Sequence, residues 1–248
     1  MSLYTSDALI LRTYKLGEAD RIVVFLTSDR GKRRGVAKGA RRTRSRFSGG
    51  LEVFTHARVS YVERENRDLV RLNYVEPVLS PLISKNADVL GYAGYFSELV
   101  DEWVLEGDPS ERMYRLGVAV ISALATGASV KRVARYFEYW LLRLQGVYPS
   151  VLSCQNCGLE LKSCGARVSP TEGICICTKC DNEQDGHRLS PDSIDFLLAA
   201  SSMPPDQLDN VSFTSVAARE LMAVHRLLIH ENLNKELKSV RVLNEINA

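Results

Sequence analysis

The sequence predicts an α+β protein with a small N-terminal barrel, a helical region, and a cysteine-rich module inserted into that region. Three observations predict this: short apolar runs separated by glycines up to residue 80, helical periodicity beyond it, and six cysteines confined to residues 150–188. A chain of 248 residues suffices for two or three domains. The expected domains are 1–80, 81–149 together with 189–248, and 150–188.

Five short runs rich in apolar and β-branched residues predict strands in the first part of the chain. Glycines and Asn66 separate these runs, and no clear helical pattern interrupts them. Five strands in about 75 residues predict a small closed barrel, for which the five-stranded OB-fold is the first candidate. Barrels of this kind commonly bind nucleic acid or saccharide across one face. The predicted strands are 8–13, 21–27, 35–38, 53–62 and 69–75.

Helical periodicity begins after Pro81. Asp108-Pro109-Ser110-Glu111 and Ser190-Pro191 each combine a capping residue with a proline suited to the first helical turn. Gly127 closes one predicted helix, and Gly146 with Pro149 terminates the next, whose apolar residues share one face. Helices are therefore expected over 87–104, from 108, over 133–144, from 190, over 215–230 and in the last dozen residues.

Two C-x2-C pairs separated by 19 residues predict a structural zinc site. Four thiolates complete tetrahedral zinc and leave no position open for catalysis. Cys164 and Cys175 are expected not to be ligands, because Cys175 could pair with Cys177 only as C-x-C, although replacement of a predicted ligand by Cys175 or Cys164 stays open. A redox CxxC would need a thioredoxin-like context that the sequence lacks. The predicted ligands are Cys154, Cys157, Cys177 and Cys180.

The net charge of +2 conceals a strongly basic N-terminal part. Residues 1–80 hold 16 Lys and Arg against 9 Asp and Glu, whereas the remaining residues hold 16 against 21. Nine of the seventeen residues from 30 to 46 are basic and none is acidic. A polyanion relieves the mutual repulsion of such a segment. The alternative is a solvated basic loop, but the run lies between predicted strands and is spaced by glycines.

The sequence lacks the motifs of common enzymes. It has no G-x-x-x-x-G-K-[ST], no G-x-S-x-G, and an H-E-x-x-N rather than H-E-x-x-H at residues 230–234. The basic region holds no acidic cluster for a metal-dependent nuclease. We therefore expect a binding protein and not an enzyme. No apolar run is long enough for a membrane helix, and the N-terminus does not resemble a signal peptide, so we expect no membrane partner and a cytosolic location.

Several strings of residues resemble the RecO family of bacterial DNA repair proteins. The most specific are the ordered strings between residues 17 and 56, and the resemblance extends over nearly the whole chain. The strings are Gly17-Glu18-Ala19-Asp20-Arg21, residues 35–42 (GVAKGARR), Ser45-Arg46-Phe47, Phe54-Thr55-His56, residues 137–144 (FEYWLLRL) with Gly146, the cysteine pairs, and Leu189-Ser190-Pro191.

The resemblance implies an OB-fold, a helical domain and a four-cysteine zinc module. It also implies binding of single- and double-stranded DNA, annealing of complementary strands, and loading of the RecA recombinase onto DNA coated with single-strand-binding protein (SSB). RecR, and in one branch RecF, would be partners, the SSB C-terminal tail would contact the helical domain, and the protein would associate with the nucleoid. The expected DNA contacts are Arg33, Arg34, Lys38, Arg41, Arg42, Arg44, Arg46 and Phe47.

Two residue roles and two other functions stay open at this point. Phe47 could stack on a base or close the barrel core. A basic cluster of Lys131, Arg132 and Arg135 is a candidate for the acidic SSB tail, or a solvated helix face. A barrel with a zinc ribbon also suits structured RNA, and a metal-dependent nuclease would degrade an oligonucleotide in the presence of magnesium.

Overall fold

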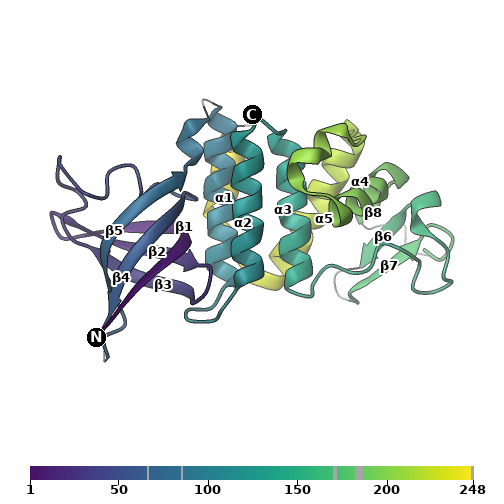
Figure 1. Cartoon of the computed structure of the whole chain (residues 1–248). Coiled ribbons are helices and arrows are strands. Elements are labelled where there is room, and N and C mark those ends of the chain that lie inside the picture. Colours follow the sequence, from purple (N-terminus) through teal and green to yellow (C-terminus); the bar gives the residue numbers. More distant parts are fainter. Residues whose placement is uncertain (66, 85, 170–171, 182–186, 247–248) are drawn as a thin grey trace. The chain divides into compact units, whose positions relative to one another are not determined.

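The computed structural model describes residues 1–248 except 66, 85, 170–171, 182–186 and 247–248 (Figure 1). The chain forms two compact units. The first comprises Met1–Ala125 and Leu237–Ala248, and the second comprises Thr126–Glu236. The first unit groups two helices and the C-terminal helix with the N-terminal strands, while the domain borders expected from the sequence remain a prediction.

Five strands form the N-terminal sheet and close into a barrel in the order β1-β2-β3-β5-β4. All neighbours are antiparallel except β3 and β5, which pair in parallel. This confirms the predicted α+β class with five N-terminal strands. The strands are β1 (Ser2–Leu16), β2 (Asp20–Thr27), β3 (Gly31–Ala37), β4 (His56–Glu63) and β5 (Val70–Leu79).

The interior of the barrel is filled by alternate residues of each strand, among them Phe25 and Tyr61. A bulge between Ile10 and Arg12 shifts β1 by one residue, so that Arg12 faces outward although Ile10 faces the core. β3 begins four residues earlier than expected because its basic residues pair in register with β2. Part of the basic run therefore lies within a strand.

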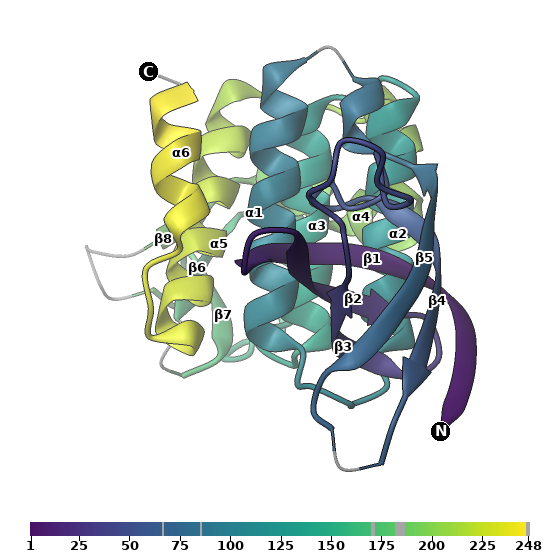
Figure 2. The same cartoon turned by 90° about the vertical axis from the view of Figure 1, so that its left-hand side faces the viewer.

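Helices α1 (Ala87–Trp103), α2 (Glu111–Ala125) and α6 (Lys238–Ile246) complete the first unit. Figure 2 shows the barrel strands in front of α1 and α2, with α6 beside α1. Glu98 of α1 holds α6 in place: its carboxylate accepts hydrogen bonds from the backbone N–H groups of Lys238 (3.2 Å) and Ser239 (2.8 Å). These N–H groups lie in the first turn of α6, where no intrahelical acceptor exists.

Ion pairs join α1 to the outer surface of the barrel. Arg12 Nε lies 2.8 Å from Asp101 Oδ2, and Arg12 Nη2 lies 3.2 Å from Glu102 Oε1. Lys32 Nζ lies 3.1 Å from Asp101 Oδ1 and donates to the Asp101 carbonyl at 2.5 Å. All four side chains are largely withdrawn from water, so these contacts fix α1 against β1 and β3.

The second unit contains α3 (Val130–Leu144), α4 (Pro191–Ser202), α5 (Ser215–Leu233) and a small sheet of order β7-β6-β8. Its strands are β6 (Ala166–Ser169), β7 (Ile174–Cys177) and β8 (His187–Leu189). The helices predicted around residues 133–144, 190 and 215–230 are confirmed, and Ser190 caps α4 as expected by accepting from the N–H of Ser193. No helix in the described part of the chain is long and apolar enough to cross a bilayer.

A buried polar cluster lies in the core of the second unit. His225 of α5 is fully buried, with Nδ1 2.8 Å from Glu138 Oε2 and Nε2 3.2 Å from the Tyr148 hydroxyl. Glu138 also accepts from Arg135 at 2.7 Å, one turn earlier on α3. Burial lowers the pKa of His225, and the Glu138 carboxylate opposes this without reversing it. His225 is therefore a residue of the core.

Because of His225, the second unit should become less stable as the pH decreases below 6.5. A folded-state pKa below the unfolded value means that the unfolded chain binds the proton more readily as the pH falls. The wild-type chain should therefore lose up to about 1.4 kcal/mol per pH unit more than His225→Gln. Urea unfolding at pH 7.5 and 5.5, followed through Trp140 in a Trp103→Phe background, measures this.

His230→Gln is the control, since His230 is a solvent-exposed histidine of the same helix. It should retain the pH dependence of the parent chain. If stability depended equally on pH in the parent chain and in His225→Gln, the assignment of this effect to His225 would be contradicted.

Candidate functional site

The nine basic residues between 30 and 46 divide into two groups. Arg30, Lys32 and Arg33 are engaged within the first unit: the Arg30 guanidinium lies 3.8 Å from the centre of the Tyr4 ring, and Lys32 pairs with Asp101. The other six are exposed to solvent. These are Arg34, Lys38, Arg41, Arg42, Arg44 and Arg46.

Two of the expected DNA contacts face away from the outer surface. Arg33 pairs with Phe25, whose side chain belongs to the barrel core, so Arg33 points toward the interior, where its side chain interacts with Tyr61. Phe47 is 2% exposed and belongs to the same core. A ring in this position has no free face for a base, so the structure favours the core role for Phe47, and we leave both residues out of the site.

The segment from Lys38 to Thr55 connects β3 to β4 and carries five of the six exposed basic residues, whereas Arg34 lies within β3. Its start is tied to the turn between β1 and β2: Asp20 accepts from the N–H of Gly39 at 2.8 Å, and Gly39 has a φ of 73° that favours glycine. The Arg41 N–H donates to the Ala19 carbonyl at 2.9 Å, and its guanidinium to the Gly17 carbonyl at 3.0 Å. Arg41 therefore lies at the rim of the barrel beside this turn.

The strand registers define an outward-facing row across four strands. Tyr14 of β1 pairs with Ile22 of β2, Ile22 with Val36 of β3, and Val36 with Arg71 of β5. Their neighbours in the alternation, such as Val23 and Val70, fill the barrel core, so the row itself lies on the outer surface. Arg12, Val24 and Arg34 form the adjacent row. We call this surface the outer face.

A groove of about 560 Å³ opens at the β5 end of the outer face. Its lining combines apolar residues of the strands with four basic side chains and one acidic side chain. The basic residues are Lys38, Arg64, Arg67 and Arg71, and the acidic residue is Asp68. Sequence reasoning missed the three arginines because they lie outside the run of residues 30–46; only the pairing of β3 with β5 brings them beside Lys38.

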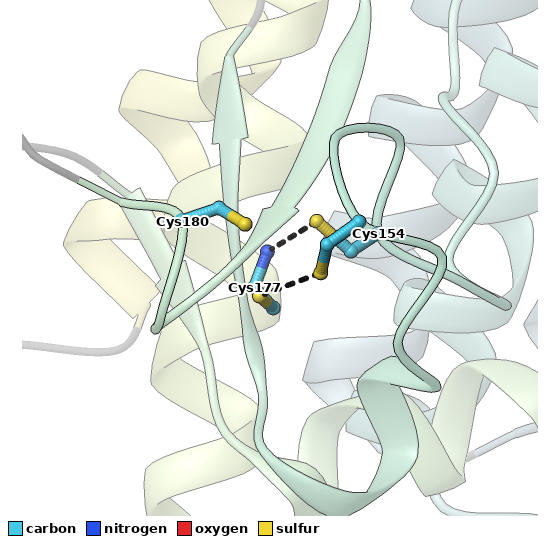
Figure 3. A group of neighbouring side chains, drawn as sticks. Cys154, Cys177 and Cys180 are labelled. Atoms are coloured by element: carbon cyan, nitrogen blue, oxygen red, sulfur yellow. Dashed lines mark hydrogen bonds between the residues drawn. The ribbon is translucent and has the colours of Figure 1, made fainter.

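The four predicted cysteine ligands come together in the second unit. Their sulfur atoms all lie within 4.8 Å of one another, and Cys157 Sγ is 3.6 Å from Cys177 Sγ. Figure 3 shows Cys154 approaching Cys177 from the preceding loop, with Cys180 in the turn after β7. Tetrahedral zinc with Zn–S bonds of about 2.3 Å requires sulfur atoms about 3.8 Å apart. The four residues therefore fit a metal ion.

The backbone around the cluster also favours thiolates. Burial by itself raises the pKa of Cys154, but backbone N–H groups, including that of Cys177 at 3.3 Å, donate to its sulfur and lower the pKa to about 6. Four thiolates form a soft donor set typical of zinc or iron–sulfur sites.

The other two cysteines lie outside this cluster within the described residues. Cys175 is fully buried, and burial raises the pKa of its thiol to about 12. Cys164 Sγ interacts with backbone carbonyls of Glu160 and Gly165. The ligand set expected from the two C-x2-C pairs is thus the one that the structure brings together.

The basic cluster considered for an acidic peptide does not form a common surface. Lys131 is exposed, but Arg132 lies 3.5 Å from Asp209 and donates to the Leu208 carbonyl at 2.9 Å. Arg135 is buried against Glu138. Two of the three charges are thus engaged within the second unit.

The chain combines a five-stranded barrel that has a cationic outer face with a helical unit that has a four-thiol site. These features define a barrel-and-helix protein whose candidate binding residues lie on the barrel. The family described as "Recombination protein O N terminal" matches residues 1–81, and "Recombination protein O C terminal" matches residues 85–241. The chain belongs to the RecO family.

Relatives support this membership. The DNA repair protein RecO of Geobacter metallireducens is 31% identical across 97% of both chains, and that of Symbiobacterium thermophilum is 30% identical across 100% of this chain and 99% of its own. The DNA repair protein RecO of Koribacter versatilis is 39% identical over 160 residues, which cover 64% of this chain and 65% of the relative. Membership supports a role in DNA repair and recombination.

The four-thiol cluster should hold about one metal ion per chain. Cys177→Ser should abolish binding and lower the melting temperature, because the remaining thiols leave the coordination incomplete. Elemental analysis of the purified chain together with thermal unfolding measures both effects.

Cys164→Ser is the matched control, since it removes a thiol of the same module that lies outside the cluster. It should keep the ion. A wild-type chain that folds with the same melting temperature and without metal would refute the assignment.

Proposed function

We propose that this chain is a DNA-binding recombination mediator that anneals complementary single strands and helps load RecA onto SSB-coated DNA. The observation that carries the proposal is the concentration of exposed basic residues on the first unit, six from the run of residues 30–46 and three more beside Lys38. The family membership supports DNA as the polyanion.

The proposed partners follow from the family. They are single- and double-stranded DNA, the C-terminal tail of SSB, RecR, RecA and, in one branch, RecF. A protein with this role acts on the chromosome, in the nucleoid. The proposal assigns no covalent chemistry to the chain and thus describes a binding protein rather than an enzyme.

Phosphate neutralisation would supply most of the affinity. Each Lys or Arg that contacts a single strand releases condensed counterions and contributes about −0.7 to the slope of log affinity against log salt. About five such contacts give a slope of roughly −3.5. Two strands held on one cationic surface repel each other less and meet at a higher effective concentration, which accelerates annealing.

The cysteine cluster would hold a structural zinc ion. Four protein thiolates leave no open position, so the ion takes no part in a reaction. The three strands of this module are only three or four residues long, and the metal would supply folding energy that so small a sheet lacks.

Loss of two outer-face cations should weaken DNA binding and its salt dependence together. Arg34→Ala/Arg71→Ala removes two phosphate contacts, so the salt slope for a single-stranded oligonucleotide should become shallower by about 1.4. The quadruple variant of Arg41, Arg42, Arg44 and Arg46 to Ala should stay folded and lose most of its affinity. Fluorescence anisotropy across a salt titration measures both.

Arg112→Ala/Arg115→Ala is the control, because it removes the same charge from exposed positions of α2 in the same unit. It should retain the wild-type slope. Equal effects of the two double variants would show that only net charge matters and would refute the location of the site.

Annealing of SSB-coated strands tests the mediator role. The wild-type chain should accelerate annealing of two complementary oligonucleotides coated with SSB, and deletion of the SSB tail should abolish this acceleration. Acceleration with naked strands alone would indicate a generic cationic binder. Absence of annealing in both cases, together with stronger binding to structured RNA, would favour the RNA-binding alternative.

A further inference from the structure

The row across the outer face places an exposed aromatic ring beside an apolar floor. Tyr14 is 45% exposed, and the next two residues of the row, its cross-strand partner Ile22 and then Val36, are half-buried. The Tyr14 side chain also interacts with Arg12, which α1 holds through Asp101. The ring is therefore positioned by residues that are themselves fixed.

The two ends of this row differ in charge. At the β5 end, Arg71 and Lys38 line the basic groove of about 560 Å³. At the β1 end, Tyr14 lines a second groove of about 410 Å³, whose far wall includes Glu102 and Glu106 from the end of α1 and the segment after it. The lining of the second groove also includes three basic side chains, Arg12, Lys32 and Arg34, so its charges are mixed, and a phosphate backbone is attracted more strongly to the first end.

We infer that the outer face selects an unpaired strand, with Tyr14 stacking on one base while Lys38 and Arg71 hold the adjacent phosphates. This inference rests on the proposed function and adds the state of the nucleic acid that the site takes. Strands about 4.8 Å apart separate Tyr14 from Arg71 by roughly 14 Å, a span that suits a short stretch of single strand.

A duplex does not satisfy this arrangement. Its internal bases are stacked on both sides and offer no free face to Tyr14. A duplex can therefore keep the phosphate contacts at the β5 end, but it gains nothing from the ring of Tyr14 at the β1 end.

Removal of the ring should weaken single-strand binding alone. Tyr14→Ala should lose about 5- to 150-fold in affinity for an unstructured oligothymidine, whereas affinity for a hairpin duplex and the salt slope should not change. Tyr14→Phe should stay within about twofold of wild type, because the ring face remains. Anisotropy with both labelled DNAs at fixed salt measures these differences.

Tyr74→Ala is the matched control, because Tyr74 is a tyrosine of similar exposure (40%) on β5 that lines neither groove. It should bind both DNAs like wild type. An oligonucleotide of abasic sites should bind wild type and Tyr14→Ala equally, since it has no base to stack. Photocrosslinking of a 5-bromouracil oligonucleotide should modify a peptide that contains Tyr14.

The outcomes separate this inference from the proposed function. Wild-type protein that binds neither DNA overturns both. Wild-type protein that binds DNA while Tyr14→Ala keeps its single-strand affinity, or loses single-strand and duplex affinity equally, overturns the inference and leaves the proposed function standing.

Discussion

The ion pairs between α1 and the barrel determine which basic residues remain available to a ligand. Asp101 lies within 3.1 Å of both Arg12 and Lys32, and all three side chains are largely shielded from water. Loss of the carboxylate would leave two poorly solvated cations, which is costly. Because α1 neutralises this end of β3, the exposed charges lie at the other end, around Lys38 and in the segment that follows it.

Local patterns made much of this fold predictable, and long-range pairing accounts for what they missed. Alternating apolar residues, helix caps and the two C-x2-C pairs each act over a few residues, so the class, most helices and the cysteine cluster follow from the sequence. The parallel pairing of Val36 with Arg71 joins residues 35 positions apart and has no local signal. The inward orientations of Arg33 and Phe47 likewise depend on strand pairing and on closure of the barrel, which composition does not encode.

The four thiols that meet in the cysteine module form a group that a cation would stabilise. Sulfur atoms within 4.8 Å of one another cannot all be ionised without a counter-charge, because each thiolate raises the pKa of its neighbours. Backbone N–H groups offset this at Cys154, but a sheet as small as β6–β8 offers few such donors. Cys175, by contrast, is fully buried and lies outside this group of four, and burial raises the pKa of its thiol to about 12.

Annealing places a particular demand on a binding surface, because the strand must be held while its Watson–Crick edges stay free. Hydrogen bonds to base edges would compete directly with pairing, whereas phosphate contacts and stacking use other parts of the nucleotide. The outer face offers these two kinds of contact, basic side chains such as Lys38 and Arg71 and the ring of Tyr14. A second strand that pairs with the held bases then forms a duplex whose stacked interior no longer offers a free base face to Tyr14. Pairing itself would weaken the hold on the product, so a surface of this kind favours both capture of single strands and release of the duplex.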